Sequence, residues 1–419
     1  MRGKIMRICL LSYRGNMYCG GQGVYLYNLS KALAELGNEV HVIVGPPYPF
    51  KMKWATVHKI KTPRFNELNG DRITSENLSP LTFYEYMAAK FGNFPEIFGF
   101  SIRAFFKIKE LIKDYPFDII HDNQCIGYGL LLMKALHIPL VATIHHPLPI
   151  DRQIAMYLSE DAKTKLKQIL FYPQFMQKIV AKRIDRIITV SEFSKNEIVK
   201  HFKVPGDRIS VVHNGVDTEL FHVREKPNKN SGSDDYNITF VGNCENRVKG
   251  LPLLLKTMRY LKDNSGMKIK LTIVDKWKEE GIAPPLIKRY GLGEDIEFTG
   301  FLTFEELSKQ YAITDLIIIP SLFEGFCFPS VEAMACGTPV VAFKVGALPQ
   351  VMENGTTGIL VDPGDWRAMA NAVAKILKNK ELRESMGKKG RERVEKLFTW
   401  KNSAEQVIEI YRGIINAHR

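Results

Sequence analysis

The feature that most constrains the fold of this chain is an alternation of short apolar runs, rich in Ile and Val, with longer stretches of helical periodicity. The stretch 23–37, for example, has helical spacing and ends at a glycine. Parallel strands need long and usually helical connections, so this alternation predicts a doubly wound parallel sheet. In the first half of the chain the apolar runs occupy residues 5–11, 39–44, 117–121, 139–146 and 186–191.

The alternation begins again after residues 224–237, a polar segment rich in turn-forming residues that we interpret as a linker. The chain has 419 residues, whereas a single hydrophobic core stops growing near ~250–300 residues. The sequence therefore predicts an α/β fold with two Rossmann-like domains, which face a central cleft at the carboxyl ends of their strands. The later apolar runs and helical stretches occupy residues 238–242, 251–261, 270–274, 296–300, 304–313 and 316–320.

Composition excludes several classes of protein. Hydrophobic residues make up 45% of the chain, which is ample for buried cores. No run approaches the ~20 apolar residues of a membrane-spanning helix, and the apolar run near the N-terminus is too short for a signal peptide. The six cysteines are scattered without a CxxC pair or metal-ligand spacing, which predicts a reduced, cytoplasmic compartment.

The net charge of +13 is unevenly distributed. Residues 1–210 hold 29 Lys and Arg against 18 Asp and Glu. This excess favours an anionic partner such as a phosphorylated substrate or an acidic lipid surface, although a solvated basic surface without a partner explains it equally well. No nucleic-acid-binding motif or dense basic tract is present, which argues against nucleic acid. The aromatic segment 83–113 either lies against a membrane surface or packs as helices on the N-terminal sheet.

Two glutamates eight positions apart stand out in the segment "EGFCFPSVEAMACGTPVVA". Pro329 suits the first turn of a helix, so we expect Glu324 in the preceding loop and Glu332 on the helix itself. In isolation, glutamates near a helix N-terminus are adequately explained as complements to the helix dipole.

Two other segments have the composition of phosphate-binding turns. The loop "SYRGNMYCGGQGVY" contains Gly21 and precedes a helix whose N-terminus can meet an anion, but it lacks the G-x-G-x-x-G spacing. The segment "FVGNCENRVKG" places Arg247 and Lys249 after a strand, where cations can meet a diphosphate. Each segment alone is equally consistent with an ordinary surface loop.

Taken with "ATIHH", "ITVSEFSKNEI", "ISVVHNGVDTELF" and "GTTGILVDPGD", these segments resemble the retaining glycosyltransferases of family 4 (glycosyl transferases group 1), which have the GT-B fold. The likeness covers nearly the whole chain. It implies a glycosyltransferase (EC 2.4 class) of glycan or glycolipid biosynthesis. Such an enzyme moves a sugar from a UDP- or GDP-sugar to a hydroxyl of a glycan, a lipid-linked acceptor or a phosphorylated small molecule, with retention and without a metal.

The resemblance also implies how the chain is divided. Residues 1–218 would form the acceptor-binding domain, and residues 219–399 the nucleotide-sugar-binding domain. Residues 400–419 would form a helix that packs on the N-terminal domain. The protein would be cytoplasmic, with a peripheral contact at the anionic inner membrane face as a further expectation. The sequence does not indicate the oligomeric state.

The resemblance assigns the donor-binding groups as follows. Glu332 would hold the ribose hydroxyls of the nucleotide, and Glu324 the hydroxyls of the transferred sugar. Backbone N–H groups at the helix N-terminus would meet the sugar or a phosphate; these belong to Phe326, Cys327 and Phe328.

Further roles follow from the same resemblance. Lys249 would neutralise the leaving diphosphate, and Gly21 would approach that group from the other domain. His145 would lie beside the reacting sugar, so that His145, Lys249 and Glu324 form the catalytic set. A histidine after a strand is more often structural, and that alternative has more weight for His121 and His146.

Two positions depart from the family pattern. The family arginine is replaced by Asn243, and Arg247 could supply the missing charge. The usual glycine of the glutamate segment is replaced by Cys327, which has no neighbouring base that would make it a nucleophile.

Two other functions compete with glycosyl transfer. A nucleotide-sugar epimerase on the same fold would bind a donor without a separate acceptor. A non-catalytic protein that binds nucleic acid or an acidic membrane would be supported only by the charge, and its affinity would depend steeply on salt.

Overall fold

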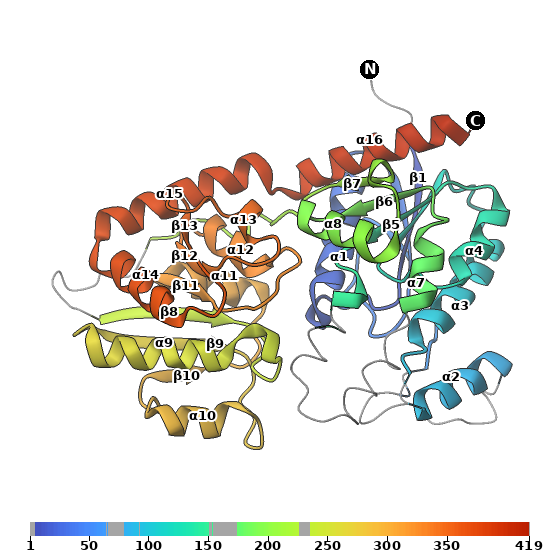
Figure 1. Cartoon of the computed structure of the whole chain (residues 1–419). Coiled ribbons are helices and arrows are strands. Elements are labelled where there is room, and N and C mark those ends of the chain that lie inside the picture. Colours follow the sequence, from blue (N-terminus) through green and yellow to red (C-terminus); the bar gives the residue numbers. More distant parts are fainter. Residues whose placement is uncertain are drawn as a thin grey trace. The chain divides into compact units, whose positions relative to one another are not determined.

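The computed structural model describes residues 5–63, 65, 79–91, 93–150, 153, 174–225 and 235–418 (Figure 1). The chain divides into two compact units. Unit 1 comprises Met1–Asn214 together with Trp400–Arg419, and unit 2 comprises Gly215–Thr399. Each unit contains one parallel sheet with helices on both faces, as the sequence predicts.

Unit 1 contains a seven-stranded sheet in the order β3-β2-β1-β4-β5-β6-β7, in which every pairing is parallel. The order reverses between β1 and β4, so the connections that follow these two strands lead in opposite directions along the sheet. The strands are β1 (Arg7–Ser12), β2 (Glu39–Val44), β3 (Thr56–Lys59), β4 (Ile119–Asn123), β5 (Leu140–Ile144), β6 (Arg186–Thr189) and β7 (Ile209–Val211).

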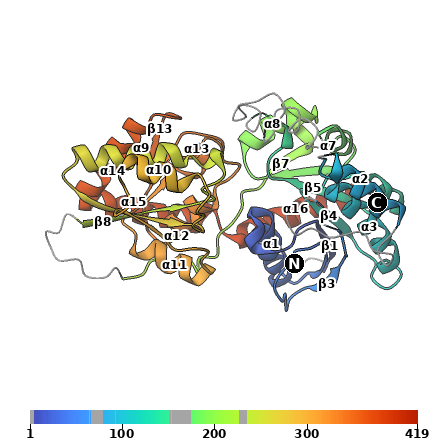
Figure 2. The same ribbon diagram turned by 90° about the horizontal axis from the view of Figure 1, so that it is seen from below.

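Helices cover both faces of this sheet. One buried apolar cluster joins α3, α4, α7 and α8 to the strands, whereas α1 packs beside α16 (Figure 2). The N-terminus of α1 requires a glycine, because a Cβ on Gly23 would lie only 2.0 Å from the carbonyl oxygen of Asn16. The helices are α1 (Gly21–Glu35), α2 (Pro80–Lys90), α3 (Glu96–Leu111), α4 (Gly129–Met133), α7 (Gln174–Ala181), α8 (Glu192–Phe202) and α16 (Trp400–His418).

The C-terminal helix α16 is built into the core of unit 1. Tyr411 is fully buried, and its hydroxyl is hydrogen-bonded to Nδ1 of His121 on β4. The ring of Trp400 packs edge-on against the ring of Tyr25 on α1, with centroids 5.9 Å apart. The sequence-based prediction that this helix returns to the N-terminal domain is therefore confirmed.

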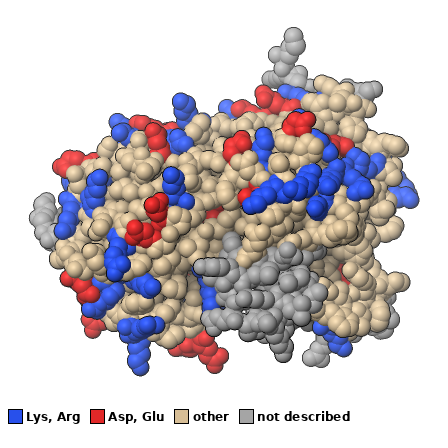
Figure 3. Space-filling model, viewed as in Figure 1, with Lys and Arg blue, Asp and Glu red and all other residues tan. Residues whose placement is uncertain are grey.

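The aromatic segment 83–113 is divided between the core and the surface. Phe100 is fully buried in the apolar cluster, whereas Phe83, Phe91 and Phe106 are more than half exposed. Within the described residues, no helix is both long enough and apolar enough to cross a membrane. On the face drawn in Figure 3, Lys and Arg side chains form a band over unit 1.

Unit 2 contains a six-stranded parallel sheet in the order β10-β9-β8-β11-β12-β13, which reverses between β8 and β11. Helices α9, α10 and α14 lie on one face, and α11, α12 and α15 on the other (Figure 2). The strands are β8 (Asp235–Val241), β9 (Lys268–Val274), β10 (Ile296–Phe298), β11 (Leu316–Ile319), β12 (Val340–Phe343) and β13 (Gly358–Val361). The helices are α9 (Leu251–Asn264), α10 (Ala283–Tyr290), α11 (Phe304–Ile313), α12 (Phe328–Ala335), α13 (Leu348–Val351), α14 (Trp366–Lys378) and α15 (Lys380–Leu397).

One boundary of the predicted linker 224–237 is wrong. Strand β8 already begins at Asp235, which pairs with Lys268 of β9. The polar first residues of β8 are accommodated because the strand end is exposed, where Asp235 forms an ion pair with Lys268 at 3.6 Å. Residues 226–234 of the predicted linker lie outside the described residues.

Candidate active site

Two loops of unit 2 meet at the point where the strand order reverses. The short 3₁₀ helix η4 (Arg247–Lys249) follows β8, and the loop containing Glu324 follows β11. Nζ of Lys249 donates a hydrogen bond of 2.8 Å to Oε1 of Glu324. Ligands of doubly wound sheets bind at this edge and at this reversal point, so the ion pair lies where a ligand is expected.

Glycines allow these loops to approach closely. Gly250 ends η4 with a left-handed φ of 75°, and a Cβ there would lie 1.9 Å from the carbonyl oxygen of Pro320. Gly346 has a φ of 52°, and its Cβ would lie 1.9 Å from the carbonyl oxygen of Glu324. That same oxygen accepts a hydrogen bond from the backbone N–H of Ala347 at 3.0 Å. The backbone that carries Glu324 is thus held by its neighbours rather than by its own loop.

The charge of Lys249 is maintained by its partner. Burial of the ammonium disfavours the charged form, but the adjacent Glu324 carboxylate outweighs that effect and raises the pKa of Lys249. The Lys249 side chain is 27% exposed. A permanent cation with access to solvent is suited to neutralising a phosphate group.

Glu332 lies on α12, as its distance from Pro329 predicts, and is only 6% exposed. Its Oε2 accepts a hydrogen bond of 2.9 Å from the hydroxyl of Tyr311 on α11. Burial raises the pKa of Glu332 to about 7, even though the Tyr311 hydroxyl acts in the opposite direction. A buried carboxylate with one oxygen held and the other available is suited to accepting a hydrogen bond from a ligand hydroxyl.

The turn before α12 adopts the backbone of a glycine although it carries a cysteine. Cys327 caps α12 with a φ of 77°, in the left-handed region. The carbonyl oxygen of Cys327 accepts two hydrogen bonds from Ser330, one from its backbone N–H at 3.1 Å and one from its hydroxyl at 2.7 Å. The thiol is buried, which raises its pKa and keeps it protonated. The rings of Phe326 and Phe328 flank the turn, with centroids 5.6 Å apart.

Arg247 lies in the same 3₁₀ turn as Lys249 and is exposed. Lys249, two positions further along this turn, is only partly exposed, so the two cations differ in their access to solvent. Asn243, at the position of the family arginine, is exposed, and its Oδ1 accepts a hydrogen bond from the N–H of Glu245 at 2.9 Å.

In unit 1, His145 directly follows β5 and is half-buried. Its Nε2 lies 2.8 Å from Oδ1 of Asn123, the last residue of the neighbouring strand β4. The ring of Tyr25 packs edge-on against the imidazole, with ring centroids 4.7 Å apart. Burial, with smaller contributions from His146 and His121, lowers the pKa of His145 to about 3, so the imidazole is neutral at physiological pH.

The other candidate residues of unit 1 occupy different environments. His121 is 1% exposed and is hydrogen-bonded on both sides, to Tyr411 and to Thr143, which supports the structural interpretation. Gly21 begins α1 and is exposed at its N-terminus. The carbonyl oxygen of His146 accepts a hydrogen bond of 2.7 Å from Nε2 of Gln124.

The structure therefore brings Lys249, Glu324 and the turn 326–328 to one edge of unit 2, while His145 and Gly21 belong to unit 1. Sequence reasoning missed Tyr311, Asn123 and Gln124. The available signal was that Asn123 closely follows the apolar run 117–121, while the run 139–146 ends in a histidine, because neighbouring parallel strands end at the same edge.

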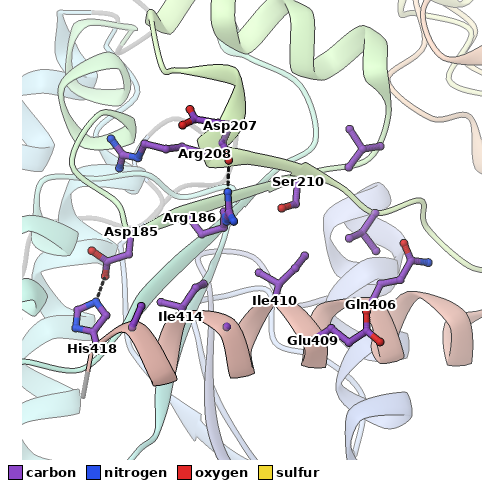
Figure 4. Close-up of a pocket in the computed structure, with 14 residues that line it drawn as sticks. Asp185, Arg186, Asp207, Arg208, Ser210, Gln406, Glu409, Ile410, Ile414 and His418 are labelled. Carbon is purple, nitrogen blue, oxygen red and sulfur yellow. Dashed lines mark hydrogen bonds and ion pairs between the residues drawn. The ribbon is translucent and has the colours of Figure 1, made fainter.

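A groove of about 1030 Å³ contains none of the predicted site residues. It lies between α16, the edge strand β7 and the amino-terminal end of β6, at the opposite edge of the sheet from His145 (Figure 4). Two contacts join residues that line it: Nε2 of His418 lies 3.4 Å from Oδ2 of Asp185, and the Arg186 guanidinium donates a hydrogen bond to the carbonyl oxygen of Asp207. It is lined by Asp185, Arg186, Asp207, Arg208, Ser210, Val211, Val212, Gln406, Glu409, Ile410, Gly413, Ile414, Ala417 and His418.

Comparison with known proteins gives consistent matches along the chain. The profile of the family Glycosyltransferase Family 4 matches residues 19–220, and that of Glycosyl transferases group 1 matches residues 223–393. The MMP alpha-(1->4)-mannosyltransferase of Mycolicibacterium hassiacum is 36% identical over 416 residues, which is 98% of each chain.

Solved structures agree on the fold. Sucrose-phosphate synthase from Thermosynechococcus elongatus superposes with a TM-score of 0.75 at 23% identity, covering 98% of this chain and 100% of that one. The Anabaena protein Alr3699/HepE in complex with UDP-glucose superposes with a TM-score of 0.68 at 18% identity, covering 97% and 100%.

Two doubly wound parallel sheets with these relatives define the class of the protein, which is a glycosyltransferase with the GT-B fold. Within that class, the chain belongs to glycosyltransferase family 4.

Proposed function

We propose that the protein transfers a sugar from a nucleoside-diphosphate sugar to a hydroxyl acceptor, with retention of anomeric configuration and without a metal ion. The observation that carries the proposal is the ion pair of Lys249 and Glu324 at the reversal point of unit 2. Lys249 is the cation for the leaving diphosphate. Glu324, whose Oε1 lies 2.8 Å from Nζ of Lys249, is the hydrogen-bond acceptor for sugar hydroxyls.

The donor-binding roles follow the chemistry of each group. Lys249 stabilises the negative charge that develops on the diphosphate as the sugar–oxygen bond breaks. Glu332, which is buried and oriented by Tyr311, accepts hydrogen bonds from the ribose hydroxyls. The backbone N–H groups of the turn 326–328 lie at the N-terminus of α12, whose partial positive charge attracts a phosphate. Arg247, in the same turn as Lys249, adds charge near the phosphates.

Unit 1 supplies the groups for the transferred sugar and the acceptor. His145 is neutral, so its role is to orient a sugar hydroxyl by a hydrogen bond and not to donate a proton. Gly21 offers the exposed N-terminus of α1 to the diphosphate. The acceptor hydroxyl forms its bond to the anomeric carbon on the face that the diphosphate leaves, and its proton passes to the leaving phosphate oxygen.

The decisive experiment is calorimetric titration with UDP, GDP and ADP in the presence of a chelator, with Glu332→Ala alongside. We expect the native protein to bind one of the three diphosphates, and the variant to bind it at least tenfold more weakly because a charge-assisted contact is lost. Glu324→Ala is the matched control, since it is expected to reduce turnover more than nucleotide affinity.

The outcomes separate the competing functions. Binding of no nucleotide would overturn the proposal and favour a non-catalytic protein. Conversion of the donor sugar to its epimer without an acceptor would identify an epimerase. Formation of the opposite anomer in the product, measured by nuclear magnetic resonance, would contradict retention.

The relative with 36% identity indicates which donors to test first. Because that protein is named as an alpha-(1->4)-mannosyltransferase, we infer that mannose is the transferred sugar and that the acceptor is a glycan or a phosphorylated or lipid-linked sugar.

The surface of unit 1 supports a peripheral contact with an anionic membrane. Lys and Arg side chains form a band over this unit in Figure 3, and three phenylalanines are exposed: Phe83 on α2, Phe91 directly after α2, and Phe106 on α3. We expect the protein to co-sediment with vesicles of phosphatidylglycerol but not with vesicles of phosphatidylcholine. Equal recovery with both vesicles would contradict the contact.

A further inference from the structure

The loop that follows β4 is held in an unusual backbone conformation. Gln124 and Ile126 have left-handed φ values of 62° and 49°, a backbone conformation that is unfavourable for residues with a side chain. The buried carboxylate of Asp122 maintains the loop, because its Oδ2 accepts a hydrogen bond of 2.9 Å from the N–H of Ile126. Strained loops of this kind persist where the surrounding structure requires them, and they cluster at functional sites.

This conformation lets the Gln124 side chain contact the backbone beyond β5. Its Oε1 accepts a hydrogen bond from the N–H of His145, and its Nε2 donates one to the carbonyl oxygen of His146. The carbonyl oxygen of His145 in turn accepts a hydrogen bond from the hydroxyl of Ser194 at 2.9 Å. The position of the His145 backbone is therefore fixed on both sides.

The orientation of the Asn123 amide is determined by its other neighbours. Its Nδ2 donates to the carbonyl oxygen of Gln22 at 3.0 Å, which can only accept. It also lies 3.3 Å from Oγ of Ser12, whose own hydrogen is donated to the carbonyl oxygen of Arg14. Oδ1 is therefore the atom that faces His145, and an amide oxygen can only accept a hydrogen bond.

The tautomer of His145 follows from this arrangement. Because Oδ1 of Asn123 only accepts, Nε2 of His145 must carry the hydrogen of the 2.8 Å contact. In a neutral imidazole the other nitrogen, Nδ1, is then an acceptor. The Tyr25 ring packs perpendicular to the imidazole, with ring centroids 4.7 Å apart, and restricts its movement on that side.

The geometry points to Asn123 as a positioning residue: it holds His145 in the Nε2–H tautomer, so that Nδ1 is presented as a hydrogen-bond acceptor to a hydroxyl of the bound sugar. The expected effect on turnover rests on the proposed function, whereas the expected tautomer of His145 does not. Without the Asn123 contact, the two tautomers would be free to exchange, and part of the enzyme would present a donor where an acceptor is needed.

The tautomer can be measured directly with the full-length protein labelled with ¹⁵N-histidine. Long-range ¹H–¹⁵N correlation spectra distinguish Nδ1–H from Nε2–H rings, and His145→Gln assigns the signals by subtraction. We expect His145 to be in the Nε2–H form in the native protein, to become mixed in Asn123→Ala, and to return toward Nε2–H in Asn123→Gln, which keeps an amide with an acceptor oxygen and a donor nitrogen. Asn28→Ala on α1 is the control for loss of an asparagine.

Turnover provides the second measurement and needs no acceptor. The probe is transfer of the sugar to water from GDP-mannose or UDP-glucose, whichever matches the diphosphate found by calorimetry. We expect Asn123→Ala to lower kcat by about 10–100-fold, as loss of an outer partner of a functional histidine does elsewhere, with little change in KM. Asn123→Gln, which keeps both the acceptor oxygen and the donor nitrogen of the amide, should recover part of kcat.

Each outcome decides the inference. An Nδ1–H ring in the native protein, or an unchanged tautomer and kcat in Asn123→Ala, would overturn it. If Asn123→Ala fails to fold, Asn123→Gln and Asn123→Ser are compared by the same spectra. Failure to bind any nucleoside diphosphate would overturn the proposed function, and the histidine spectra would still establish or refute the positioning by Asn123.

Discussion

Replacing Lys249 by methionine is expected to lower kcat for sugar transfer by about 10²–10³-fold, the usual loss when one preorganised group that stabilises transition-state charge is removed. Methionine retains much of the apolar stem of lysine but has no charge for the leaving diphosphate. The measurement is single-turnover transfer with saturating donor, which separates chemistry from binding. An unchanged rate would show that the leaving group is stabilised elsewhere.

The Lys249→Met variant needs a control because it leaves the Glu324 carboxylate without its cation. Glu324 is 7% exposed and would lose the cation 2.8 Å away, so the variant is also expected to be less stable. The double variant Lys249→Met with Glu324→Gln removes that unpaired charge. It should recover stability but not turnover. Lys262→Met, which breaks an exposed ion pair with Asp295 at 2.7 Å, is the matched control for loss of a lysine.

Replacing Glu332 by glutamine is expected to stabilise the ligand-free protein at pH 8 while weakening donor binding. The pKa of Glu332 is raised by burial from 4.5 to about 7, so the folded state favours the protonated carboxyl. Its stabilising contribution is present below about pH 4.5 and is lost as the pH rises through about 7, by up to about 3 kcal/mol. Glutamine does not titrate, and so avoids this loss.

The measurement is chemical unfolding of the native protein and the variant from pH 5 to pH 8.5, without nucleotide. We expect the difference in free energy of unfolding to grow in favour of the variant from pH 5 to about pH 7 and to stay constant above that. Tyr311→Phe is the control, because loss of the hydroxyl that lowers the pKa of Glu332 should move the change to higher pH. Parallel pH profiles for all three proteins would contradict the assignment.

Much of the fold could be predicted because local signals were strong. Helix α11 begins and ends where its periodicity indicates, since Thr303 and Glu306 form a capping box before an apolar run. Strands β3 and β7 were not predicted. They have four and three residues at the two edges of the sheet, and their short sequences carry little periodicity. The start of β8 was misplaced because its first residues are polar.

The candidate site was only partly predictable for a different reason. Lys249, Glu324 and Glu332 belong to segments whose spacing is recognisable along the chain. Asn123 contacts His145, which is 22 positions away, and Tyr311 contacts Glu332, which is 21 positions away. Such contacts depend on strand order and helix packing. The left-handed backbone of Gln124 gives no signal in the sequence, because glutamine is not a residue that favours it.

The packing of α16 determines when unit 1 can mature during translation. Residues 215–399, which form unit 2, emerge from the ribosome as one continuous segment and can fold as soon as they are clear. The sheet of unit 1 is synthesised first, yet its burial of His121 awaits Tyr411, and its packing around Tyr25 awaits Trp400. The face of unit 1 that α16 covers is therefore completed only after the whole of unit 2 has been synthesised.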